Sequence, residues 1–238
     1  MSSSSLKLYG SRLCPFVDRI KLILAFKQVP YENINVNLNM KSKEFLQLTP
    51  YGKVPVLVHN QKPIYESAAI YQYVNDVFTN HDLMHKDPYM RAMQRSWTYY
   101  CNTRLAPTIY KYMFNQDPSK EVELKQKLED RLLFLENEGL KKMQDTNGNK
   151  GSFFLGDGNE PSMPDMMYLP FLVRLDVLKT FKGFEMGKEL SRLKSMYQVN
   201  AQQDYYKNNK ELPSIEEIIK GYTPYVKGEL TMKEDWIL

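Results

Sequence analysis

The chain changes its pattern once, from alternating strand and helix signals to helix signals alone. Apolar runs at 6–9, 31–36 and 54–58 are separated by stretches of helical spacing at 17–27 and 42–48. A polar turn then leads to another short run at 63–65, and a helix pattern opens at Ser67. This order, β-α-β-(α)-β-β-α, predicts a small mixed sheet with helices on its faces.

After residue 88 the strand signals stop. Helical spacing recurs at 89–113, 119–143, 163–181, 188–203 and 214–220, and Pro107 is expected to end or kink the first of these helices. Residues 80–88 are polar and aperiodic, and residues 145–161 form a glycine-rich loop. We therefore expect two domains, an α/β domain over 6–79 and an all-helical domain over 88–238.

Composition excludes several classes of protein. A net charge of +4, with basic residues spread along the chain, argues against a nucleic-acid binder. No run approaches 18 apolar residues, and the first five residues lack the features of a secretory signal, so we expect no membrane span and a cytoplasmic location. Two cysteines make no disulfide framework. His81 and His85 have no third ligand in evidence, so no metal is expected.

Cys14 is the residue with the clearest chemical signal. It follows a strand-to-turn break and is followed by Pro15, which suits the first turn of a helix. Free N–H groups and the helix dipole favour an anion there, so the thiol pKa is expected to fall below about 8.5. Val17 occupies the second position of a Cys-x-x-Cys pair, which predicts single-cysteine chemistry. A small buried hydrophobic residue is an equally good interpretation of the position alone.

Two further signals surround the predicted hairpin. Val54-Pro55 precedes a strand. Either the peptide between them is cis, which would expose backbone groups to an extended ligand, or Pro55 is a plain proline at the start of a strand. Ser67 reads as a helix N-cap, and its helix terminus with Glu66 suits an α-amino-acid head group. The alternative for that pair is a capping serine beside a solvated acid.

Taken together, the segments Cys14-Pro15-Phe16, Tyr51-Gly52-Lys53-Val54-Pro55-Val56-Leu57 and Ile64-Tyr65-Glu66-Ser67 resemble cytosolic glutathione transferases. The Cys-Pro-Phe form is most similar to the omega class. The resemblance implies the glutathione transferase fold, with a thioredoxin-like first domain that binds glutathione and an all-helical second domain. It also implies a homodimer that uses glutathione as co-substrate.

The resemblance also implies a role for particular residues. Cys14 would form a mixed disulfide with glutathione, Val54 beside a cis Pro55 would pair with its cysteinyl backbone, and Glu66 and Ser67 would hold its γ-glutamyl end. Lys41 would lie near the glycyl carboxylate, and Arg174 would lie beside the second-substrate pocket. Ser162 and Asp165 would form a capping box at the start of a helix in the second domain. The alternative for Lys41 is a solvated surface lysine. The alternative for Arg174 is an arginine on a helix surface, paired with Asp176 or a glutamate.

Three functions follow from these residues. The first is thiol transfer or dehydroascorbate reduction through Cys14. The second is conventional conjugation, in which Ser11 or Tyr9 stabilises the thiolate of bound glutathione. The third is a non-enzymatic protein that keeps only the fold. Cys101 lies in a predicted helix and is expected to belong to the core.

Overall fold

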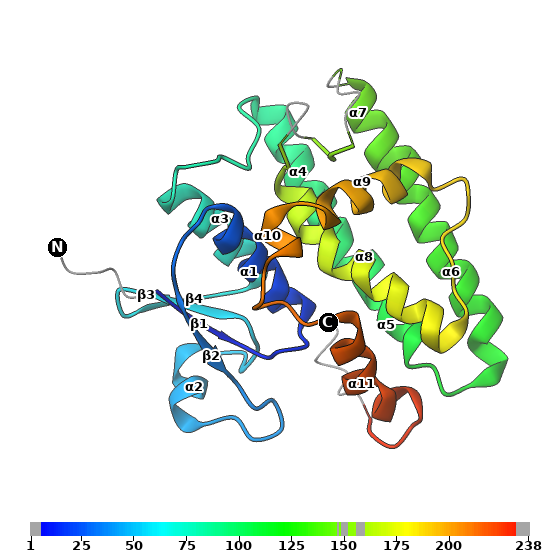
Figure 1. Ribbon diagram of the computed structural model, residues 1–238, viewed down its shortest axis with the longest axis horizontal. Coiled ribbons are helices and arrows are strands. Elements are labelled where there is room, and N and C mark those ends of the chain that lie inside the picture. The colour runs from blue at the N-terminus through cyan, green and yellow to red at the C-terminus, as the bar shows by residue number, and fades with distance from the viewer. Residues whose placement is uncertain (1–5, 147, 149–151, 156–159, 232–238) are drawn as a thin grey trace. The chain divides into compact units, whose positions relative to one another are not determined.

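The computed structural model describes residues 6–146, 148, 152–155 and 160–231 (Figure 1). The serine run at 2–5 and, within the glycine-rich loop at 145–161, residues 147, 149–151 and 156–159 lie outside this range. The chain forms two compact units, one of residues 1–82 with 204–213 and one of residues 83–203 with 214–238. As functional domains, the ranges 6–79 and 88–238 stay predictions.

The first unit is built on a four-stranded sheet in the order β2-β1-β3-β4. Its strands are β1 (Leu6–Gly10), β2 (Glu32–Asn35), β3 (Val56–His59) and β4 (Lys62–Tyr65). β1 runs parallel to β2 and antiparallel to β3, and β3 runs antiparallel to β4. The mixed sheet and its strand order along the chain are those that the sequence predicts.

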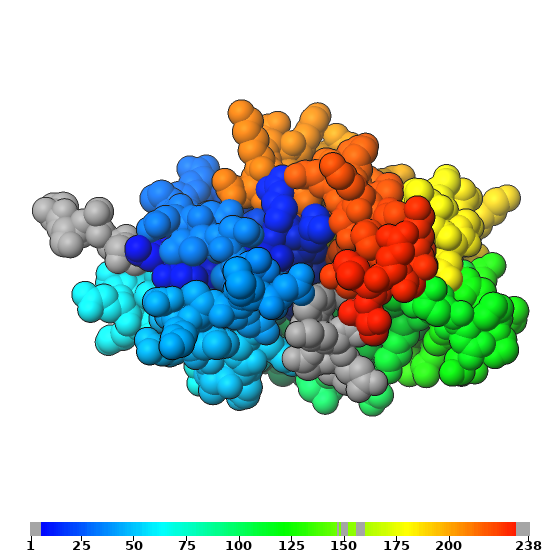
Figure 2. All heavy atoms as spheres, turned by 90° about the horizontal axis from the view of Figure 1, so that it is seen from below, coloured from blue at the N-terminus to red at the C-terminus, as the bar shows by residue number. Residues whose placement is uncertain are grey.

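Helices cover both faces of this sheet. α1 (Pro15–Phe26) and α3 (Ser67–Val77) pack against each other, and α3 also contacts β3 and β4. On the other face, the α2 helix (Lys43–Leu48) places Phe45 against Val36, Val56 and Val58, and its outer side lies at the surface (Figure 2). Because both faces are covered, all four residues of β3 are buried.

Gly10 lets α1 approach the sheet closely. A Cβ built on Gly10 would lie 2.4 Å from Cγ1 of Val17, which is fully buried on α1. Any side chain at this position must therefore push α1 away from β1 or force Val17 out of its rotamer.

We expect Gly10→Ala to lower the free energy of unfolding by about 1–3 kcal/mol, because it overpacks the contact between β1 and α1. Urea denaturation followed by circular dichroism measures the change. Val17→Ala in the same chain makes room for the new methyl group. The double variant should therefore lose less stability than the sum of the two single variants. Simple additivity of the two losses would contradict the close approach.

A segment from late in the chain completes the first unit. The short helix α10 (Asp204–Lys207) packs on α1. Beyond it, the backbone carbonyl of Glu211 accepts from Arg12 at 2.7 Å and from buried Lys21 at 2.8 Å. Burial lowers the pKa of Lys21. No pattern in the sequence predicts this return of the chain to the first unit.

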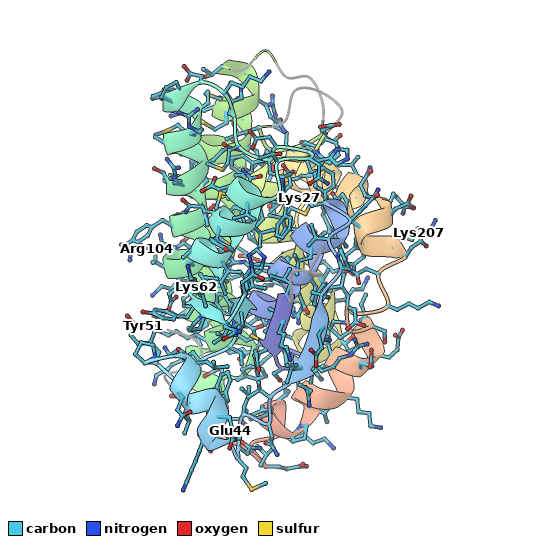
Figure 3. All side chains as sticks on the ribbon, turned by 90° about the vertical axis from the view of Figure 1, so that its left-hand side faces the viewer. Lys27, Glu44, Tyr51, Lys62, Arg104 and Lys207 are labelled. Carbon is cyan, nitrogen blue, oxygen red and sulfur yellow. The ribbon has the colours of Figure 1, made fainter. Side chains whose placement is uncertain are left out.

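Lys27 fixes the segment that leads out of the first unit. Its side chain is 1% exposed and donates to the carbonyls of Phe78, Asn80 and His81 at 2.7, 2.8 and 3.0 Å. The side-chain amide of Asn80 donates back to the Lys27 carbonyl. Lys27 follows the last residue of α1 (Figure 3), so one buried ammonium ties the ends of α1 and α3 together.

The second unit is helical over its described residues. Its α-helices are α4 (Pro88–Tyr100), α5 (Ala106–Met113), α6 (Glu121–Phe134), α7 (Lys142–Thr146), α8 (Met163–Lys182), α9 (Ser191–Ala201) and α11 (Ile215–Val226). Three further turns, η1 (Cys101–Leu105), η2 (Pro118–Lys120) and η3 (Leu135–Lys141), join some of them. α11 runs through Pro224, beyond the helix predicted at 214–220. No helix among the described residues is long and apolar enough to cross a membrane.

Pro107 does not end its helix, so that half of the prediction was wrong, whereas the alternative of a kink stays a prediction. The wider π-helical turn η1 joins α4 to α5, and Pro107 lies in the first turn of α5. A π-helical turn already changes the regular hydrogen-bond ladder, so the missing N–H of the proline is tolerated there. Cys101 in the same turn is fully buried, as expected, with its Sγ 3.9 Å from the Met167 carbonyl oxygen.

Candidate functional site

The register of the sheet places the ends of several segments at one edge. β1 and β4 both end where β3 begins, because β3 is antiparallel to each of them. α1 follows β1 and α3 follows β4, so both helices begin at this edge. The predicted site residues that lie there are Cys14, Val54, Pro55, Glu66 and Ser67.

Cys14 is the N-cap of α1, with extended backbone angles, and its side chain is partly exposed. Its backbone N–H donates to the Ser11 carbonyl at 3.1 Å, which closes the turn between β1 and the helix. Pro15 takes the first helical position, as the sequence predicts. The sulfur thus lies at a helix N-terminus, where backbone N–H groups and the helix dipole favour a negative charge.

The peptide between Val54 and Pro55 is cis, which is one of the two alternatives that the sequence left open. The turn before it brings Lys41 close: the Lys41 ammonium lies 4.0 Å from the place that a Cβ would take on Gly52. Tyr51, labelled in Figure 3, is exposed beside this turn and packs edge-on against Tyr65. The structure therefore brings Lys41 beside Gly52, two residues before Val54.

Glu66, rather than Ser67, is the N-cap of α3, so the predicted cap position was wrong by one residue. Glu66 has a φ of 68°, a left-handed backbone that turns the chain sharply from β4 into the helix. Ser67 is then the first helical residue, and its buried Oγ lies 3.4 Å from Nη1 of Arg19. Strained backbone of this kind at a non-glycine residue is typical of ligand-binding sites.

Glu66→Gly is expected to be more stable than Glu66→Ala by about 1 kcal/mol, because glycine adopts the left-handed backbone without strain. Thermal and urea unfolding of the two variants measure the difference. Lys127, exposed on α6, provides the control pair, since there Ala should exceed Gly by about 1 kcal/mol. A Glu66→Ala variant as stable as Glu66→Gly would show that the residue stores no strain.

Two other residues named from the sequence, Arg174 and Tyr9, have contacts of their own. Arg174, on α8 of the second unit, is 1% exposed and donates to the Pro170 carbonyl at 3.1 Å. It is therefore not a surface arginine, and Asp176 accepts instead from Tyr197. Tyr9 packs on the ring of Phe45, with the ring centroids 6.3 Å apart. The roles of Arg174 and Tyr9 with a ligand stay predictions.

Comparison with known proteins agrees with this arrangement. Residues 8–81 match the model of the glutathione S-transferase N-terminal domain. The chain is 32% identical over 182 residues to glutathione S-transferase U9 of Arabidopsis thaliana, covering 75% of this chain and 71% of the relative. Among solved structures, a tau-class transferase from mango, at 24% identity, covers 93% of this chain and 98% of its own, with a TM-score of 0.82.

Another similar structure is an omega-class transferase, Omega 3C from Trametes versicolor. It is 25% identical and covers 94% of this chain and 91% of its own, with a TM-score of 0.76. The thioredoxin-like sheet unit and the helical unit define the fold of the glutathione transferases. The chain belongs to the glutathione transferase family.

The curated relatives do not support the omega class that the Cys-Pro-Phe motif suggested, and the mango structure is of the tau class. The chain spans 61% and 60% of the length of the first curated relatives that it matches. The relatives thus establish the family of this protein but not its class or its reaction.

Proposed function

We propose that the protein is a glutathione-dependent thiol transferase, an activity of the omega type, that works through Cys14. The observation that supports this most strongly is the place of the Cys14 sulfur. It is partly exposed at the N-terminus of α1, at the sheet edge that also holds the cis Val54–Pro55 peptide and the strained Glu66. A thiolate in such a place is an effective nucleophile.

The proposed reaction needs only a glutathione mixed disulfide as substrate and a second molecule of glutathione. The Cys14 thiolate attacks the glutathione sulfur of a mixed disulfide, the old S–S bond breaks, and the other half leaves as a thiolate that takes a proton. Cys14 is then disulfide-bonded to glutathione. The thiolate of a second glutathione attacks the glutathione sulfur of this intermediate, which releases glutathione disulfide and restores the Cys14 thiolate. We propose the same thiol for the reduction of dehydroascorbate, in which two glutathione molecules supply two electrons and two protons and leave as glutathione disulfide.

Glutathione binding is proposed for the same sheet edge. The backbone of Val54 would pair with the cysteinyl part of glutathione in the manner of an added strand. The γ-glutamyl carboxylate would lie at the N-terminus of α3, with Ser67 as a donor and Glu66 accepting from the ammonium group. The Lys41 ammonium, beside Gly52, would face the glycyl carboxylate. A homodimer, as in other transferases, also stays a prediction, which the mass of the protein in solution would test.

Conjugation is the second candidate. It is favoured by the curated relatives, which are named glutathione S-transferases. In that case the nucleophile is the thiolate of bound glutathione rather than Cys14, and a hydroxyl such as that of Ser11 stabilises it. The two candidates share a binding site and differ in which sulfur reacts.

The alkylation rate of Cys14 against pH, with and without glutathione, tests the proposal. We expect iodoacetamide to react with a pH midpoint well below the ordinary value of about 8.5, and glutathione to protect Cys14. Treatment with glutathione disulfide should leave glutathione attached to Cys14, as peptide mass analysis would detect. An ordinary midpoint without any attached glutathione would overturn the proposal.

A further inference from the structure

Arg19 is a fully buried cation of the first unit. It lies on α1 with none of its side chain exposed, and its guanidinium carbon is 5.0 Å from the centroid of the Phe16 ring. A charge in such a place costs free energy that an apolar side chain of similar volume would not. The apolar neighbours Ile20 and Ile23 on the same helix are equally buried. Packing alone therefore does not explain why an arginine occupies this position.

Its contact with α3 distinguishes Arg19 from two other buried cations of this unit. Lys21 donates to the Glu211 carbonyl, and Lys27 donates to three carbonyls at the end of α3, so each of them fixes backbone. Among the contacts of Arg19, its Nη1 lies 3.4 Å from the side-chain oxygen of Ser67. Ser67 is the first residue of α3 and is itself 6% exposed.

The donor and the acceptor in the contact between Arg19 and Ser67 are fixed by their chemistry. A guanidinium has only donors, so in this contact the Ser67 oxygen accepts. Its O–H is then directed away from Arg19 and is available to donate to an anion at the N-terminus of α3. The buried positive charge lies behind this hydroxyl and adds to the favourable field of the helix terminus. Both effects favour a carboxylate at the same place.

We propose that Arg19 is a positioning residue for the γ-glutamyl carboxylate of glutathione. It fixes the Ser67 hydroxyl as a donor to that carboxylate and supplies a buried positive charge behind it. This inference rests on the proposed binding of glutathione at Glu66 and Ser67. Arg19 itself touches Ser67 and acts on the ligand through it.

Two ligands separate this role from a structural one. One is glutathione, and the other is the analogue in which 4-aminobutyrate replaces the γ-glutamyl residue, so that only its carboxylate is missing. We expect Arg19→Met to raise the Kd for glutathione about tenfold, as expected for loss of a charge-assisted contact, and the Kd for the analogue less than twofold. In turnover, KM for glutathione should rise while kcat stays near the wild-type value.

The matched control is Lys27→Met, which removes another buried cation that does not touch Ser67. It should lower stability without changing the ratio of the two Kd values. Should Arg19→Met fail to fold, Arg19→Lys decides, since it keeps the charge but not the fixed donor geometry, and should raise the glutathione Kd selectively by a smaller factor.

An equal loss for both ligands, or no loss for either, would overturn the positioning role. Wild-type protein that fails to bind glutathione would instead overturn the proposed function. The two failures are therefore distinguishable.

Discussion

Cys14→Ser is expected to lower glutathione-dependent thiol transfer by on the order of 10³ or more, because a serine hydroxyl does not cleave a disulfide. Glutathione should still bind with nearly its wild-type Kd. The proposed contacts to the tripeptide come from Val54, Glu66 and Ser67, and the substitution leaves them in place. Initial rates with a glutathione mixed disulfide, together with calorimetric titration of glutathione, measure the two effects separately.

Cys101→Ala is the matched control for this experiment. Cys101 is the other cysteine of the chain, fully buried in the second unit. Its replacement should lower stability somewhat but leave the rate per folded molecule unchanged. Thiol transfer that survives in Cys14→Ser would refute the mechanism. If conjugation of chlorodinitrobenzene also survives, Ser11 or another hydroxyl becomes the group that stabilises the glutathione thiolate.

The sequence predicted most of the first unit because the signals there are local. The strand and helix order, the helix predicted at 42–48 and the Cys14–Pro15 start of α1 each depend on a few neighbouring residues. The edge at which the site residues gather also follows from strand order alone. A cis Val54–Pro55 peptide stayed one of two alternatives, since sequence does not distinguish the isomers.

The missed features depend on contacts between distant residues. The return of residues 204–213 to the first unit rests on Arg12 and Lys21, some 190 positions away from Glu211. The burial of Arg19 could not be read from a helix pattern in which Asp18, Arg19 and Lys21 look like a solvated face. All three are buried. One signal in the sequence could have predicted the burial of Arg19: charged residues lie on an otherwise apolar helix that follows a reactive cysteine.

Asp165 is the most heavily bonded carboxylate described in the second unit. It accepts from the backbone N–H and the hydroxyl of Ser162 at 2.8 and 2.6 Å, from the Phe154 N–H at 3.0 Å and from the Asn200 amide at 3.2 Å. The predicted capping box of α8 is thereby confirmed. The carboxylate also joins α8 to α9 and to the segment that contains Phe154, and none of it is exposed.

Asp165→Ala is therefore expected to lower the free energy of unfolding by about 4 kcal/mol or more, since it leaves several buried donors without an acceptor. A loss of this size is a large part of the stability of a typical domain, so the variant should accumulate mainly as unfolded or aggregated protein.

Asp117→Ala is the matched control, because Asp117 also accepts from a helical N–H, that of Ser119, but is exposed. It should cost about 1 kcal/mol. Equal losses in urea denaturation would mean that the buried network adds nothing to the cap. A much larger loss at Asp165 would show that this carboxylate holds three segments together.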